Sequence, residues 1–287
     1  HHNKAHITLL TTAPFEKMGR DCGYFDDVWV DTRPKFYHIG RWVSLARRLN
    51  SAGFDRVYDL QNNDRTSFYF TLFRPKPQWS GIARGASHRN ESPERTARRA
   101  FEGHCQTLAI AGIQDIDIDT LDWMGAKQAV KTPDKPYIML IPGCSPQHPE
   151  KRWPSAFFIE LTDKAARAGF RNVIIGTDDE KDVTAAIAKS GQNVADMTGQ
   201  TSLYDIAALA GKAACVIGND TGPMHIAAAT GSPCVPLFCT RKSNPEKHGP
   251  LGAQVNPMSA ANLSAISPGQ VWEKVSALAA VNGADPS

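Results

Sequence analysis

The sequence predicts an α/β protein, and two observations support this fold class. Apolar runs of strand length alternate with amphipathic or alanine-rich stretches of helix length along most of the 287 residues. In the second half, polar loops follow directly after the apolar runs. Such alternation is typical of a parallel sheet covered by helices on both faces, and ligands of these sheets bind beyond the carboxyl ends of the strands.

The first half is expected to combine short strands with two helical segments. Strands are predicted at residues 6–12, 26–33 and 54–61. Residues 39–52 place Trp42 and Leu49 on one helical face, and Gly53 follows as a stop. Residues 91–112 form a charged, helix-like segment.

The second half is expected to repeat strand and helix several times. Strands are predicted at residues 137–143, at the start of 171–182, at 213–220 and at 232–238. Helices are predicted at residues 156–169, 204–213 and 221–231. Ser155 is a candidate cap for the first of these helices, and Ser202 or Thr201 for the second.

A domain boundary is expected where hydrophobic periodicity is lost. Residues 125–136, GAKQAVKTPDKP, gain proline and lysine and contain no apolar repeat. This predicts one domain over residues 1–130 and a second over residues 131–287, whose last helix would return to the first domain.

Composition limits the function classes. A hydrophobic content of 41% with 21% charged residues indicates a globular protein with a full core. A net charge of +3 is too small for a typical nucleic-acid-binding domain, so we expect no nucleic-acid partner. The six cysteines form no CxxC pair and no metal spacing, which predicts reduced thiols, a cytoplasmic protein and no metal site. No stretch approaches the ~20 apolar residues of a membrane span.

Two polar loops after predicted strands are candidates for anion or nucleotide binding. SPQHPEKRW starts at Ser145 and carries the adjacent cations Lys151 and Arg152, which suit a phosphate or form a solvated basic turn. GTDDEK contains Asp178 and Glu180 just before a predicted helix. Acids at this position either complement the helix dipole or accept hydrogen bonds from ribose hydroxyls.

The segment GNDTGPMHIAAATG, residues 218–231, combines a strand end with a helix start. Asp220 ends the strand, and Thr221 and Gly222 turn the chain into the helix. Free backbone N–H groups at a helix start favour anions, and glycine lets a ligand approach the backbone closely. His225 lies in the first turn of this helix, where a histidine is either structural or directed at the same ligand.

Together these motifs resemble glycosyltransferase family 9, the ADP-heptose:lipopolysaccharide heptosyltransferases. The resemblance rests on residues 142–154, on GTDDEK, on NDTGPMHIAAATGSPCVPLF (219–238), and on DLQNNDRTSFY (59–69) in the first half. It implies a GT-B fold, in which two Rossmann-like domains face each other across a cleft. The first domain would bind the acceptor and the second a nucleotide-diphosphate sugar.

The resemblance also implies roles for individual residues. Lys151 would contact the donor phosphates, together with Ser145 and Arg152 of the same loop. Asp178 or Glu180 would bind the ribose. The diphosphate and the transferred sugar would contact four residues of the last motif, namely Asp220, Thr221, Gly222 and His225. The implied reaction is inverting transfer of heptose from ADP-heptose to a lipid-linked saccharide of the lipopolysaccharide core, without cofactor or metal.

Two departures from the family pattern leave alternatives open. The family's catalytic aspartate lies in a first strand–turn unit that we expect to precede residue 1 in a longer chain. Residues 239–252 replace the family's aromatic-bearing loop. Other donors or acceptors, and a catalytically inactive nucleotide-sugar-binding protein, are therefore kept as alternatives.

Peripheral association with the cytoplasmic face of the inner membrane is a further expectation. It would use arginines of the first half, against the alternative of a solvated surface. They are Arg41, Arg47, Arg48, Arg84, Arg89, Arg95, Arg98 and Arg99.

Overall fold

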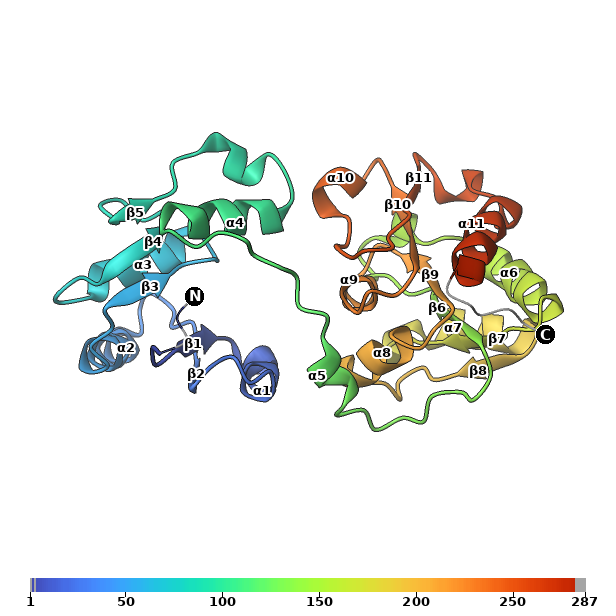
Figure 1. Ribbon diagram of the computed structural model, residues 1–287, viewed down its shortest axis with the longest axis horizontal. Helices are drawn as coiled ribbons and strands as arrows, with labels where there is room; N and C mark the ends of the chain where they lie inside the picture. The colour runs from blue at the N-terminus through green and yellow to red at the C-terminus, as the bar shows by residue number, and fades with distance from the viewer. Residues whose placement is uncertain (1, 3, 282–287) are drawn as a thin grey trace. The chain divides into compact units, whose positions relative to one another are not determined.

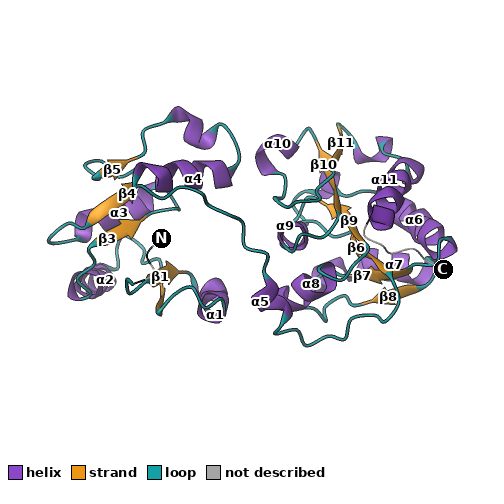
Figure 2. Ribbon diagram, viewed as in Figure 1, coloured by secondary structure: helices purple, strands orange, loops and turns teal. Residues whose placement is uncertain are grey.

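The structure is a computed structural model that describes residue 2 and residues 4–281. The chain forms two compact units that divide between Asp117 and Ile118 (Figure 1). Each unit combines parallel strands with helices (Figure 2), which confirms the predicted α/β class. No helix of the described residues is long and apolar enough to cross a bilayer.

The first unit has two parallel sheets among its described residues. In one sheet β1 (Thr8–Thr11) pairs with β2 (Asp27–Val30). The other has the order β3 (Arg56–Tyr58), β4 (Gln78–Gly81) and β5 (His88–Arg89). The helices are α1 (Ala13–Asp21), α2 (Ile39–Ser51), α3 (Asp64–Leu72) and α4 (Ala100–Ile110), with a short 3₁₀ helix, η1 (Pro93–Thr96).

One hydrophobic cluster connects the two sheets of the first unit. Phe70, Phe73 and Trp79 are its buried centre. Leu10 of β1 and Val57 of β3 both pack against it. The two sheets therefore share a core although they are not hydrogen-bonded to each other among the described residues.

The prediction of one helical segment over residues 91–112 is wrong in its first part. Pro93 starts the separate turn η1, which is capped by the Ser92 side chain. Arg99 then has an extended backbone (ψ 146°) and precedes α4. The extended residue breaks the helix.

The second unit is built on one parallel sheet of order β11-β10-β9-β6-β7-β8. The strands are β6 (Tyr137–Ile141), β7 (Arg171–Ile174), β8 (Val194–Asp196), β9 (Cys215–Asn219), β10 (Cys234–Cys239) and β11 (Met258–Ala260). The longer helices are α6 (Ser155–Arg167), α7 (Lys181–Ser190), α8 (Leu203–Ala210), α9 (Gly222–Ala229) and α11 (Pro268–Val281). The short ones are α5 (Asp122–Gly125), α10 (Pro245–His248), η2 (Pro149–Lys151), η3 (Asp178–Glu180) and η4 (Leu263–Ala265).

Helices cover both faces of this sheet. Ile138 and Leu140 of β6 belong to a core with α6, α7 and α11, whereas Tyr137, Met139 and Ile141 belong to a core with α8 and α9. Alternate side chains of one strand thus enter opposite cores. A strand buried on both faces must be apolar throughout, which explains the uninterrupted run YIMLI.

Of the two helix caps predicted in the second unit, the structure contains one. Ser202 caps α8, as predicted, in a reciprocal pair with Asp205. Ser155 does not cap α6, and that prediction is wrong, because the helix already begins at Ser155 and Pro154 occupies the cap position. All six cysteines are free thiols.

The segment 125–136 lies in the second unit. Asp205 Oδ1 accepts hydrogen bonds from the backbone N–H groups of Ala129 (2.6 Å) and Val130 (2.9 Å). Burial alone would raise the pKa of Asp205, but these bonds and those from Ser202 lower it to about 2. This carboxylate anchors the segment that enters β6.

Candidate functional site

Three polar loops leave the same edge of the second sheet. They follow β6, β7 and β9, which are neighbours in the order β9-β6-β7 and run parallel. The carboxyl ends of parallel neighbours lie side by side, so the predicted motifs after these strands are brought together. This edge is therefore the candidate ligand site.

Asn219, at the end of β9, connects two of these loops. Its side chain is completely buried. Its Nδ2 donates to the carbonyl of Pro142 at 2.7 Å, and its Oδ1 accepts from the backbone N–H of Trp153 at 3.0 Å. Asn219 therefore positions both ends of the loop that carries Lys151. Sequence reasoning missed this residue, although an amide directly before Asp220 at a strand end was a usable signal.

Lys151, Asp220 and His225 form the charged centre of the edge. Lys151 Nζ lies 3.0 Å from Asp220 Oδ2, and His225 Nε2 lies 4.0 Å from Asp220 Oδ1. The side chain of Lys151 is 18% exposed and that of Asp220 is 9% exposed. Asp220 thus holds a largely desolvated ammonium group in place, while half of the His225 side chain stays accessible.

The titration of His225 depends on this arrangement. Burial lowers its pKa below 6.5, the Asp220 carboxylate opposes that shift, and His248 adds to it. The imidazole is therefore mainly neutral at pH 7 and can donate or accept a hydrogen bond at its accessible nitrogen.

The start of α9 presents the backbone N–H groups of Thr221 and Gly222 beside this cluster, whereas Pro223 has no N–H and the N–H of Met224 donates to the carbonyl of Thr221 at 3.1 Å. Thr221 is the N-cap residue, but its side chain forms no capping hydrogen bond; Oγ1 instead lies 3.4 Å from the carbonyl of Asn219. A Cβ added at Gly222 would meet no protein atom within 4 Å. An anion can therefore approach the helix start without a steric barrier from the protein.

Glu180 and Asp178 have different environments. Glu180 accepts hydrogen bonds from Thr177 N (2.7 Å) and Thr177 Oγ1 (3.1 Å), and its Oε1 would be 1.9 Å from a Cβ added at Gly143. Glu180 thus packs over the start of the Lys151 loop, and a side chain at position 143 would displace its carboxylate. Asp178 is 75% exposed and pairs with Lys181 at 2.8 Å.

Arg152 and Ser145 are separate from the charged centre. Arg152 Nη2 donates to the carbonyl of Cys144 at 3.0 Å, and its Nε is buried without a partner. Ser145 is exposed, and its carbonyl accepts a hydrogen bond from His148 N. In the structure Arg152 braces its own loop, and neither residue has a described contact with Asp220.

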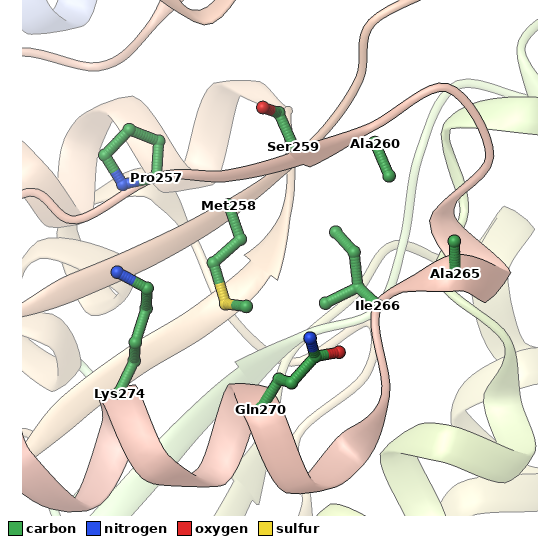
Figure 3. Close-up of a pocket in the computed structure, with 8 residues that line it drawn as sticks. All are labelled: Pro257, Met258, Ser259, Ala260, Ala265, Ile266, Gln270 and Lys274. Carbon is green, nitrogen blue, oxygen red and sulfur yellow. The ribbon is translucent and has the colours of Figure 1, made fainter.

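A further pocket lies away from these motifs. It has a volume of about 280 Å³ and is lined by β11 and the start of α11, including Met258, Ile266, Gln270 and Lys274 (Figure 3). It contains none of the predicted site residues. Within residues 2 and 4–281, no group of His, Cys, Asp and Glu side chains is arranged to hold a metal ion.

Comparison with known families identifies the chain. The model of glycosyltransferase family 9 (heptosyltransferase) matches residues 42–269, which include all three loops. The chain belongs to glycosyltransferase family 9. This confirms the resemblance that the motifs indicated.

Two curated relatives illustrate the sequence similarity. Lipopolysaccharide heptosyltransferase 1 of Pseudomonas aeruginosa is 27% identical over 212 residues, which is 69% of this chain and 58% of the relative. Lipopolysaccharide heptosyltransferase 2 of Escherichia coli is 31% identical over 123 residues, which is 41% of this chain and 34% of the relative. The matches thus span less than two thirds of the length of these relatives, and the family assignment rests on the family model.

Solved structures of family members share the fold. The family 9 glycosyltransferase of Veillonella parvula has a TM-score of 0.77 at 23% identity, covering 96% of this chain and 88% of its own. ADP-heptose lipopolysaccharide heptosyltransferase II of E. coli has a TM-score of 0.74 at 19% identity, and the match covers 98% of this chain and 91% of that chain. E. coli heptosyltransferase WaaC, solved with ADP, has a TM-score of 0.73 at 16% identity, and the match covers 94% of this chain and 89% of that chain. The predicted GT-B fold is confirmed.

Proposed function

We propose that this protein is an inverting glycosyltransferase that transfers a heptose from ADP-heptose to a lipid-linked saccharide of the lipopolysaccharide core. The observation that carries the proposal is the Lys151–Asp220 pair (3.0 Å) beside the open first turn of α9. Family membership and relatives named as heptosyltransferases support the choice of sugar and acceptor.

In the proposed reaction the acceptor hydroxyl attacks the anomeric carbon, and the bond from that carbon to the β-phosphate oxygen breaks. The leaving ADP gains negative charge on its diphosphate. Lys151 and the N–H groups at the start of α9 would stabilise that charge. This stabilisation of the leaving group is the largest contribution to catalysis that we expect from this site. A general base must remove the hydroxyl proton, and we assign this role to no described residue.

Asp220 would hold the Lys151 ammonium in place until a phosphate replaces or joins the carboxylate. His225, neutral and half-accessible, would donate a hydrogen bond to the diphosphate or the sugar. Of the two candidate ribose ligands, we favour Glu180, because it packs over Gly143 beside the Lys151 loop, whereas Asp178 is exposed and paired with Lys181.

E. coli heptosyltransferase WaaC has been solved with ADP and with ADP-2-deoxy-2-fluoro heptose. By analogy, ADP-heptose is the donor that we propose for this chain. A lipid-linked acceptor would place the protein at the cytoplasmic face of the inner membrane as a peripheral protein.

Donor turnover tests the proposal directly. The purified protein is incubated with ADP-heptose, GDP-sugars or UDP-sugars and a lipopolysaccharide core acceptor, and released nucleotide is measured. We expect release of ADP that depends on the acceptor. Turnover of UDP-sugars alone would exclude the heptosyl assignment, and nucleotide binding without any turnover would support the inactive binding protein instead.

A further inference from the structure

A group of large apolar side chains lies exposed on the first unit. It consists of Phe36, Tyr37, Ile39 and Val43, from the loop after β2 and the start of α2, and of Phe68 from α3; these residues are here called the aromatic face. Phe36, Tyr37 and Ile39 are 84%, 70% and 73% exposed, respectively. Contiguous apolar surface of this kind marks an interaction site more often than single exposed residues do.

Trp42 makes the aromatic face continuous between α2 and α3. The rings of Phe36 and Trp42 are stacked with centroids 6.4 Å apart, and the ring of Phe68 meets Trp42 edge-on at 5.0 Å. Trp42 also donates a hydrogen bond from Nε1 to the carbonyl of Lys35 at 3.2 Å. The exposed rings are thus held by the fold.

The chain segment that carries most of the aromatic face is positively charged. Residues 32–48 contain five cations, Arg33, Lys35, Arg41, Arg47 and Arg48, and no acidic residue. In the described part of the chain, Arg33, Lys35, Arg41 and Arg47 form no ion pair with a carboxylate. In contrast, Arg89 pairs with Glu91, and Arg98 lies 3.8 Å from Glu94.

We infer that the aromatic face and its cations dock on the anionic surface of a lipid bilayer. Aromatic rings are favoured at the boundary between headgroups and acyl chains, and adjacent Lys and Arg side chains are attracted to anionic headgroups. A second copy of the chain is a poorer occupant, because a symmetric contact would bring two sets of like charges together. The inference rests on the proposed function only in that a lipid-linked acceptor would be found at such a surface.

Flotation of the intact protein with vesicles tests the inference. Vesicles of phosphatidylcholine alone are compared with vesicles of phosphatidylcholine and phosphatidylglycerol. We expect binding to the anionic vesicles only, weakened by salt. The double variant Phe36→Ser, Ile39→Ser should bind about tenfold more weakly, and Lys35→Ala about fivefold. Phe15→Ser, which changes a 52% exposed residue of α1 outside the face, is the matched control and should bind like the wild type.

Three results would overturn the inference: no binding of the wild type to anionic vesicles, equal binding of the double variant and the wild type, or a wild-type dimer that the double variant dissociates. ADP affinity of the same preparations is measured by calorimetry. Because the candidate donor residues all lie in the second unit, ADP binding without vesicle binding contradicts only the docking surface. Vesicle binding without ADP binding contradicts only the proposed function.

Discussion

Lys151 is the residue on which the proposed donor site depends most. Its ammonium group lies 3.0 Å from Asp220, in a position with 18% side-chain exposure. A charge-assisted contact in such an environment is stronger than one at an open surface, because water competes less. The paired carboxylate also holds the Lys151 side chain in position when no ligand is bound.

Lys151→Ala should therefore weaken ADP binding by about 10- to 100-fold, the equivalent of one lost charge-assisted hydrogen bond. Isothermal titration calorimetry measures the effect. Lys189→Ala, at the exposed end of α7, is the matched control and should bind ADP like the wild type. Circular dichroism verifies folding, since Asp220 loses its partner in the variant. Unchanged ADP affinity in a folded variant would remove Lys151 from the site.

His225 supports a prediction about pH. Burial lowers its pKa below 6.5, and Asp220 and His248 act in opposite directions. NMR titration should therefore give a midpoint below 6.5 for the wild type, a lower one for Asp220→Asn and a higher one for His248→Ala. The folded protein binds this proton less readily than the unfolded chain does. Protonation of His225 should therefore lower the free energy of unfolding as the pH falls below 6.5 and through the pKa of the folded protein. Midpoints that move in the opposite directions would contradict the assigned contacts.

At the scale of single elements, the start of α9 is the part of the site that backbone geometry defines. Gly222 is its first residue, and the position that a Cβ would occupy there is open space. A phosphate oxygen that binds the adjacent N–H groups would lie ~3 Å from them, in the same space. The contribution of the helix start to ADP binding can therefore be tested separately from the contribution of the Lys151 charge.

Gly222→Ala should leave the fold intact and lower ADP affinity by about tenfold, because the added methyl group meets the ligand and not the protein. The free energy of unfolding should change by less than ~0.5 kcal/mol. Gly40→Ala, in the first turn of α2, also has no atom within 4 Å and should change neither quantity. Calorimetry and thermal unfolding measure the two effects. Normal ADP binding by Gly222→Ala would place the diphosphate elsewhere.

The elements also explain how far the sequence could predict the structure. In the second sheet β6, β7, β9 and β10 were predicted, because β6, β9 and β10 are buried on both faces and are apolar except for Asn219 at the end of β9. The three-residue edge strands β8 and β11 were not predicted. In the first unit the strands are two to four residues long, so no periodicity could develop. α1, α3, β4 and β5 were not predicted there.

The site was only partly predictable for a related reason. Loops after strands identified Lys151, Asp220 and His225, but Asn219 acts through partners 66 and 77 residues away in the chain. The aromatic face could not be predicted either. Phe68 and Phe70 lie in the same helix, yet one is 42% exposed and the other 2%, and tertiary packing alone determines which.

At the scale of the whole molecule, the two units have separate hydrophobic cores. Phe70 and Trp79 centre the core of the first unit, whereas two other clusters cover the faces of the sheet in the second unit. The candidate donor residues all belong to residues 118–287. A ligand that binds one of two separately packed units stabilises that unit more than the other.

Differential scanning calorimetry should therefore resolve two transitions, of which ADP raises one. At a concentration of 100 times its Kd, ADP adds about 2.7 kcal/mol to the unit that binds it. For a unit of this size that corresponds to a rise of about 5–10 °C in Tm. Lys151→Ala, with its 10- to 100-fold weaker binding, should reduce the stabilisation at the same ADP concentration to about 0.4–1.4 kcal/mol and shrink the rise in proportion. Phe36→Ser, Ile39→Ser should retain the full rise. An equal ADP-induced rise in two resolved transitions would mean that both units bind the nucleotide, and it would contradict the assignment of the donor site to the second unit alone.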